Sequence, residues 1–279
     1  MRFNFSVFLK RKHLWLCRCW FVFLLFFSST VIAESFETKF NQAQRLVADG
    51  KFEEAFNKAD AAFTEAKAKL NPDDPMLAKF LNLLADLYLN RGKFKIAIAY
   101  HENAIAIRKM AYGELNYEVA ESLNNLGITY YSLQHYENAE KYLQESLDVC
   151  EKIFATDHLS LAYPLENLGK LYRDMGRYVE SEVLFLRAIK IREKAKVSSS
   201  LLASTLRNCG ELYLLMGAYA KAKSIFVRAL KYQDEQKKQD PTAMMKLCQS
   251  LADISRKLGD PDAAKKYDEQ AVQHSSVGY

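Results

Sequence analysis

The chain has 279 residues, of which 49% are apolar and only 15 are glycine or proline, a composition that argues against extended disorder and favours helix throughout. The formal net charge of +5 is carried by residues 1–33, because the rest of the chain holds 34 basic and 34 acidic residues. This balance argues against nucleic acid as a partner, since binding it requires a clustered basic excess.

Residues 1–33 are typical of an export signal. They contain five basic and no acidic residues, and the basic stretch leads into an apolar run over residues 19–27. Val31 lies three residues before Glu34, and Ala33 lies directly before it. A signal peptidase accepts small or short apolar side chains at these two positions. We therefore predict cleavage after Ala33 and a periplasmic or secreted mature chain.

The alternative is an uncleaved anchor in the inner membrane. The uncharged run over residues 19–33 has 15 residues. That length gives about 22 Å of helix, which is shorter than the ~30 Å hydrocarbon core of a bilayer. We therefore favour cleavage, and we expect contact with a membrane only if this segment is retained.

From residue 36 onward, one pattern repeats six times with a period of 42 residues, or 41 in one case. Counted from the first residue of a unit, each unit carries small residues at positions 8, 20 and 27. Most units also carry Gly at position 15. A fixed period of this size predicts stacked helix hairpins that cannot bury their apolar faces alone. The units start near Phe36, Ala78, Ala120, Ala162, Ala203 and Met245.

The small residues and the glycines have steric reasons. Small side chains at positions 8 and 20 let two antiparallel helices approach closely. Gly at position 15 lets the chain leave the first helix in a left-handed conformation. Gln134 occupies this position in the third unit, so we expect its turn to cost up to ~1 kcal/mol.

This pattern resembles the tetratricopeptide repeat. Residues 124–127, 156–162 and 188–194 are similar to the 42-residue subtype found in kinesin light chains. The resemblance implies an all-α fold, a right-handed superhelical solenoid of about six hairpins. It implies no motor function, because an exported chain does not meet a cytoplasmic motor. We expect a repeat domain over residues 34–274 and a frayed tail over 275–279.

Three cysteines remain after the signal segment. Cys209 and Cys248 fall at apolar positions of successive first helices, and Cys150 lies in a second helix. We expect Cys209 and Cys248 to be small buried apolar side chains. A disulfide between Cys209 and Cys248 is left open, because it requires Cα atoms within about 7 Å.

Asparagines mark the first candidate site. In repeats of this type the first helices line the concave face, and Asn at the sixth position contacts bound peptide in related repeats. Asparagine offers both a donor and an acceptor, which matches one peptide group. The alternative is that these amides bridge neighbouring helices. Asn125, Asn167 and Asn208 share the sixth position of three successive units, and Asn82 and Asn124 lie nearby as further candidates.

A second candidate feature is a charged cluster on the same face, made of Lys170, Arg173 and Arg207 with Glu211. It could select an acidic ligand segment, but we favour intramolecular ion pairs, each worth ~0.2–1 kcal/mol. Tyr131 and Tyr163 lie off the core positions and could anchor a partner.

The chain carries no recognisable catalytic or metal-binding motif, and its histidines are scattered, as expected of solvated side chains. We therefore predict no enzyme activity, no cofactor and no metal. The leading hypothesis is an exported module that binds a protein or peptide segment in its concave groove. The alternative is a structural scaffold or assembly factor in a cell-envelope complex, using its convex face or end units.

Overall fold

The computed structural model describes residues 35–234 and 241–276, so the predicted signal segment 1–33 lies outside the described residues. The chain divides into two compact units, residues 1–70 and 71–279. The described ranges contain twelve α-helices, one short 3-10 helix and no strand. The predicted all-α class is therefore confirmed.

The first unit contains one helix hairpin. Helix α2 (Phe36–Ala48) packs against α3 (Phe52–Lys69). The Ser35 side chain caps α2 by accepting a hydrogen bond from the Thr38 backbone N–H. Lys39 of α2 and Glu65 of α3 form an ion pair at 2.6 Å, which ties the two helices together.

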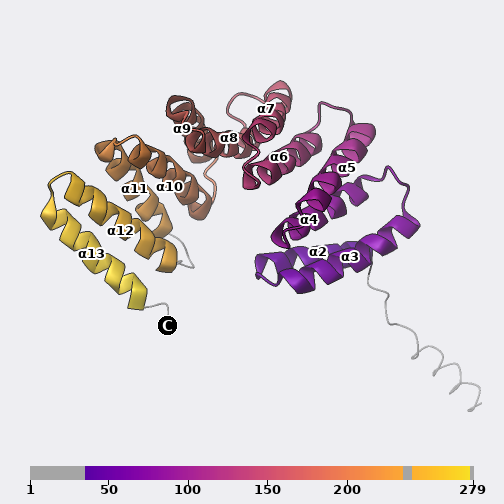
Figure 1. Ribbon diagram of the computed structural model, residues 1–279, viewed down its shortest axis with the longest axis horizontal. Coiled ribbons are helices and arrows are strands. Elements are labelled where there is room, and N and C mark those ends of the chain that lie inside the picture. The colour runs from indigo at the N-terminus through magenta and orange to yellow at the C-terminus, as the bar shows by residue number, and fades with distance from the viewer. Residues whose placement is uncertain (1–34, 235–240, 277–279) are drawn as a thin grey trace, which may run out of the picture. The chain divides into compact units, whose positions relative to one another are not determined.

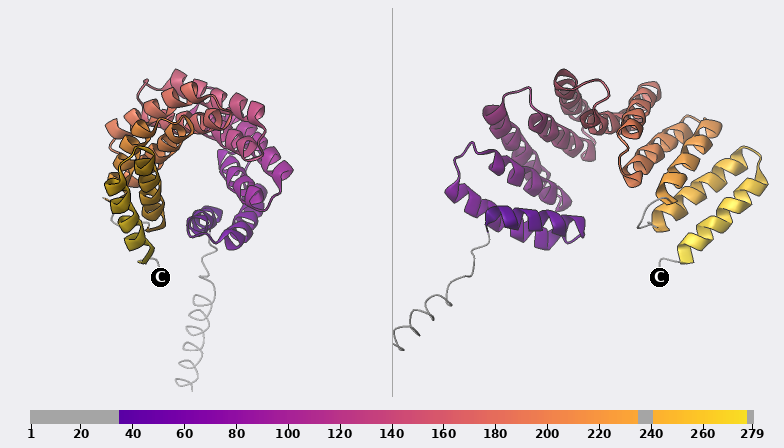
Figure 2. Two further views of the ribbon diagram at one scale, coloured as in Figure 1. Left: turned by 60° about the vertical axis from the view of Figure 1, so that its left-hand side comes forward. Right: turned by 180° about the vertical axis from the view of Figure 1, so that it is seen from behind.

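The second unit contains five hairpins, with each helix packed on its hairpin partner and each second helix packed on the first helix that follows. Helices α4, α6, α8 and α10 also contact one another in succession, so first helices line the inner side of the curve in Figures 1 and 2. This stacking defines a solenoid. The helices are α4 (Pro75–Asn90), α5 (Phe94–Tyr112), α6 (Tyr117–Ser132), α7 (Tyr136–Ile153), η1 (Leu159–Leu161), α8 (Ala162–Asp174), α9 (Tyr178–Lys194), α10 (Ser199–Leu215), α11 (Tyr219–Asp234), α12 (Pro241–Lys257) and α13 (Pro261–Ser276).

The turn inside each hairpin has a left-handed residue, as the sequence predicts. The five glycines at this position have φ between 68° and 76°, and Gln134 adopts 58°. The residue after Gln134 donates its N–H to the Tyr130 carbonyl at 3.0 Å, which closes the end of α6. The same bond follows the other turns, so Gln134 takes the geometry of a glycine despite its Cβ.

Small residues bring the two helices of a hairpin close together. A Cβ atom on Gly127 of α6 would lie 2.6 Å from Leu143 Cγ of α7, and one on Gly210 would lie 2.8 Å from the Phe226 ring. These glycines are therefore required by packing, as predicted for position 8.

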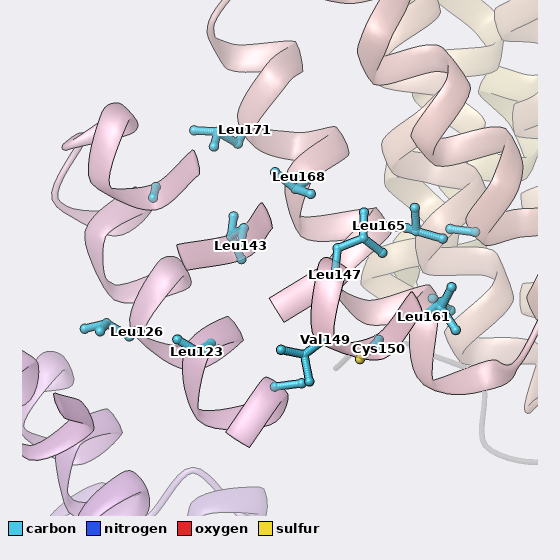
Figure 3. Close-up of a cluster of buried hydrophobic side chains, with 14 of the residues drawn as sticks. Leu123, Leu126, Leu143, Leu147, Val149, Cys150, Leu161, Leu165, Leu168 and Leu171 are labelled. Carbon is cyan, nitrogen blue, oxygen red and sulfur yellow. The ribbon is translucent and has the colours of Figure 1, made fainter. Parts of the chain in front are cut away.

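Leucines from three consecutive helices form the core at the centre of the second unit (Figure 3). Leu123, Leu143 and Leu165 come from α6, α7 and α8, and each is at most 1% exposed. Cys150 lies in this cluster, and the three cysteines of the described residues are all free and buried. The predicted role of Cys209 and Cys248 as small buried apolar side chains is confirmed, and these two cysteines form no disulfide. None of the described helices is long and apolar enough to cross a membrane.

Candidate binding surface on the inner helices

Two clefts open between first helices of the second unit. The α6–α8 cleft has a volume of about 300 Å³ and is lined by Tyr117, Ala120, Glu121, Asn124, Asn125, Ser146, Cys150, Ser160, Tyr163 and Pro164. The α10–α12 cleft has a volume of about 570 Å³ and is lined by Arg207, Asn208, Glu211, Leu214, Phe226, Lys246, Leu247, Gln249, Ser250 and Asp253. Six of the predicted site residues therefore lie in these two clefts: Asn124, Asn125, Tyr163, Arg207, Asn208 and Glu211.

Most of the predicted asparagines form hydrogen bonds between neighbouring hairpins. Asn167 of α8 donates to Asn124 Oδ1 of α6 at 2.9 Å. Asn208 of α10 donates to Glu166 Oε1 of α8 at 2.7 Å. Asn82 is only 7% exposed and donates to Ser122 Oγ of α6 at 2.9 Å. The alternative interpretation, amides that bridge helices, describes these three side chains. Asn125 is half-buried and lines the α6–α8 cleft.

Three members of the charged cluster, Lys170, Arg173 and Glu211, form ion pairs, which is the interpretation that the sequence favours, whereas Arg207 lines the α10–α12 cleft. Lys170 lies 3.1 Å from Glu166. Arg173 contacts Asp174 and Glu211, each at 2.8 Å. The pair of Arg173 with Glu211 joins α8 to α10 and places the carboxylate of Glu211 at the edge of the α10–α12 cleft.

The two predicted tyrosine anchors lie in different surroundings. Tyr163 is 49% exposed at the α6–α8 cleft. Tyr131 is half-buried, and its hydroxyl donates to Asp174 Oδ2. Burial and this hydrogen bond raise the pKa of Tyr131 to about 12. Of the two, Tyr163 is therefore the one with an exposed side chain.

Sequence reasoning missed two buried arginines at the hairpin junctions. Arg192 is fully buried and contacts Glu166 and Thr205. Arg108 is 4% exposed and donates to Glu121 at 2.8 Å and to Ser122 at 2.9 Å. A basic residue near the end of a helix is ordinarily solvated. One feature of the sequence could have indicated their burial: each arginine is followed by a hydroxyl residue, Ser122 or Thr205, at the third position of the next unit.

His101 is a further residue that the structure places differently from the expectation of a solvated histidine. It is fully buried, and its Nδ1–H donates to Asn82 Oδ1 at 2.9 Å. Burial lowers its pKa to about 4, so it is neutral at pH 7. Within residues 35–234 and 241–276, no three His, Cys, Asp or Glu side chains gather in a way that could hold a metal ion.

Comparison with known families agrees with this architecture. Tetratricopeptide repeat models match residues 76–152, 118–194, 160–235 and 246–273. The chain therefore belongs to the tetratricopeptide repeat family. Members of this family are protein-interaction modules and generally non-catalytic scaffolds. A search of curated proteins finds no match.

Solved structures show the same fold at low sequence identity. BtubC (BKLC) from P. vanneervenii has a TM-score of 0.68 and 18% identity over 88% of this chain and 93% of that one. Repeats of a putative kinesin light chain from Podosopora anserina have a TM-score of 0.58 and 18% identity over 72% and 97%. A Rap protein complexed with competence and sporulation factor has a TM-score of 0.64 and 15% identity over 87% and 75%. The resemblance to kinesin-light-chain-like repeats is thus confirmed at the level of fold.

Proposed function

We propose that this protein is an exported, non-enzymatic binding module that holds an extended protein or peptide segment along its inner helices. The observation that carries the proposal is the pair of clefts between first helices, each with polar side chains at the surface. A protein with the same fold, Rap, forms a complex with competence and sporulation factor, which supports the use of this architecture for binding a partner.

The cleft chemistry suits a peptide backbone better than a ligand with one strong charge. Asn124 and Asn125 present amides at the α6–α8 cleft, and an amide pairs with either half of a peptide group. The α10–α12 cleft carries both signs of charge, from Arg207 and Lys246 and from Glu211 and Asp253. A segment of mixed sequence is therefore the expected occupant.

Site-specific photocrosslinking in the producing cell tests this proposal. A photoreactive amino acid at Tyr163 or Arg207 should capture a partner, because both side chains line the clefts. The matched control is the same amino acid at Val183, which is 62% exposed on the outer helix α9. Capture at Val183 without capture at either cleft position would contradict the groove assignment.

A specific observation favours the alternative function, a scaffold in a cell-envelope complex. The outer helix α9 exposes Val179, Val183 and Leu186, at 71%, 62% and 43%. Their spacing of four and three residues places them on one face of the helix, and exposed apolar clusters are often contact sites. Capture from Val183 alone would support this function.

Export is tested separately by intact-mass analysis of the protein recovered outside the cytoplasm. A mature chain that begins at Glu34 is expected if the basic and apolar segment before it is a cleaved signal. Retention of Met1 in membrane fractions would instead support the anchored form.

A further inference from the structure

One position near the end of the second helix differs between successive hairpins. Arg108, Cys150 and Arg192 are spaced by 42 residues and occupy equivalent places in α5, α7 and α9. All three are buried, at 4%, 1% and 0% exposure. Arg108 and Arg192 therefore place a long cationic side chain where α5 and α9 pack on the next hairpin. Cys150 places a short thiol at the equivalent contact of α7.

The guanidinium of Arg192 shows what this place in the fold can hold. It contacts the carboxylate of Glu166 and the hydroxyl of Thr205. It also lies 5.1 Å from the centre of the Tyr163 ring, within the range of a cation–π interaction. Arg108 likewise contacts a carboxylate, that of Glu121, and a hydroxyl, that of Ser122.

Around Cys150, the residues equivalent to the partners of Arg192 surround an open space. The counterparts of Glu166, Tyr163 and Thr205 are Asn124, Glu121 and Pro164. These three residues and Cys150 all line the α6–α8 cleft. The cleft therefore lies where a guanidinium lies at the neighbouring junctions, and it exists because Cys150 is too short to fill that space.

The cleft runs from an accessible rim to a closed floor. Tyr163 and Glu121 at the rim are exposed, whereas Ser146 and Cys150 at the floor are each 1% exposed. The volume of about 300 Å³ is at the lower end of the range for ligand sites, ~300–1,000 Å³. This shape fits one side chain entering from the inner face.

The charges around the cleft are compatible with a cation. Arg192 is paired with Glu166, and Arg108 is paired with one oxygen of Glu121, Oε2, so the second oxygen of Glu121 remains as an acceptor at the rim. Burial and the nearby Glu151 raise the pKa of the Cys150 thiol to about 11, so the floor is neutral. The second carboxylate oxygen of Glu121, the amide oxygens of Asn124 and Asn125 and the Tyr163 ring offer hydrogen-bond acceptors and an aromatic face. Asn124 Oδ1 also accepts from Asn167, and the Tyr163 ring also contacts Arg192, so a bound cation would share these two groups.

We propose that the α6–α8 cleft binds an arginine side chain of the partner segment, whose guanidinium takes the place that Arg108 and Arg192 occupy at the adjacent junctions. This inference rests on the proposed function, because it assigns one subsite of the inner surface. The planar guanidinium donates several hydrogen bonds and can also lie against the tyrosine ring.

Calorimetric titration of the full chain with two short peptides tests the assignment. The probes are acetyl-Gly-Ala-Arg-Ala-Gly-amide and the same peptide with citrulline, which keeps the length and shape but removes the positive charge. The arginine peptide should bind at least about tenfold more tightly, because a hydrogen bond to a charged group is stronger than a neutral one. Equal affinities, or no binding of the arginine peptide, would overturn the proposal.

Variants locate the site. Glu121→Gln should remove the preference for arginine over citrulline, whereas Glu137→Gln, the same charge change at an exposed position on α7, should retain it. Cys150→Arg should abolish binding by filling the cleft from within. If that variant does not fold by circular dichroism, Cys150→Met narrows the floor with an apolar group and should weaken binding. Unchanged preference in Glu121→Gln would exclude this cleft.

The two proposals fail in different ways. Partner capture at Tyr163 together with equal binding of both peptides would refute the arginine subsite and leave the binding surface in place. A preference for the arginine peptide together with partner capture only at Val183 would mean that the cleft binds arginine but that the partner binds elsewhere. That result would refute the groove function.

Discussion

Two charged side chains, Arg192 and Glu166, lie buried together between α8, α9 and α10. Arg192→Met removes the cation and leaves a buried carboxylate with Lys170, Thr205 and Asn208 as its remaining partners. We expect the free energy of unfolding to fall by about 3–5 kcal/mol, because removing one partner of a buried ion pair leaves the other charge incompletely compensated. Urea denaturation measures the change, and adding Glu166→Gln should restore at least half of the loss.

The same pair predicts a response to acid. Burial raises the pKa of Glu166, but Lys170 and Arg192 outweigh it and hold the pKa below its ordinary value of 4.5. A carboxyl whose pKa is depressed by folding stabilises the protein above the unfolded pKa, and this contribution is lost as pH falls through the folded pKa. The stability difference between wild type and Glu166→Gln should therefore shrink below pH 4.5. A constant difference between pH 7 and pH 3 would contradict this assignment.

The turn at Gln134 is a second prediction at the residue scale. Its φ of 58° is left-handed, and a side chain with a Cβ is disfavoured there by about 1–2 kcal/mol. Gln134→Gly should raise the free energy of unfolding by about 0.5–1 kcal/mol, since the added freedom of glycine in the unfolded chain offsets part of the gain. The readout is the midpoint of urea unfolding at an unchanged slope.

Gly92→Gln is the matched control for this turn, because it places the residue of the third hairpin in the turn of the second. A Cβ on Gly92 would meet no atom within 4 Å, so the effect comes from the backbone alone. The control should lower stability by a similar amount. A stabilising effect of Gly92→Gln would show that φ does not decide the cost.

Some residues could be predicted from the sequence and others could not, for physical reasons. The left-handed conformation of Gln134 could be predicted, because a turn at position 15 depends only on local backbone geometry. The exposure of Tyr163 could also be predicted, because this residue lies outside the apolar core positions of its helix. The burial of Arg192 and His101 could not, because Arg192 depends on Thr205 of the next hairpin and His101 depends on Asn82 of the facing helix in its own hairpin.

At the scale of a hairpin, close contact between paired helices rests on one glycine. In Gly127→Ala, the new Cβ would lie 2.6 Å from Leu143 Cγ and 3.1 Å from the Leu143 backbone nitrogen, which rotation of a side chain cannot relieve. We expect the free energy of unfolding to fall by about 1–3 kcal/mol, although Ala is favoured over Gly in a helix by about 1 kcal/mol.

Gly169→Ala gives the comparison for that prediction. The three atoms nearest to its Cβ would be ring atoms of Phe185, at 3.1–3.2 Å, and a ring can shift by a few tenths of an ångström. The loss in thermal or urea unfolding should therefore be smaller than for Gly127→Ala. Equal losses in the two variants would mean that backbone approach does not set the cost.

The elements themselves were largely predictable, because the sequence marks both of their features. Small residues such as Gly127 and Gly169 mark where the two helices meet, and glycines at positive φ mark where the first helix ends. The clefts were not predictable. They depend on the length of single side chains at the junctions, such as Cys150, in a pattern that otherwise repeats.

At the scale of the whole molecule, stacking makes stability a matter of neighbours. Leu247, Leu251 and Ile254 of α12 belong to the same buried cluster as Leu212 of α10 and Phe226 of α11. A chain that ends at residue 234 lacks α12 and α13 and therefore uncovers this part of α10 and α11. Each buried side chain of this size contributes about 1.5–3 kcal/mol, so the last remaining hairpin should be destabilised by several kcal/mol.

Hydrogen exchange followed by mass spectrometry tests this dependence on neighbours. In the shortened chain, backbone amides of α10 and α11 should exchange at least about tenfold faster, since 1.4 kcal/mol corresponds to tenfold. Amides of α6 and α7 should be nearly unchanged, because their cluster of Leu123, Leu143 and Leu165 includes no residue of α12 or α13. Loss of protection along α6 and α7 to the same degree would show one cooperative core in place of a stack in which each hairpin is stabilised by the next.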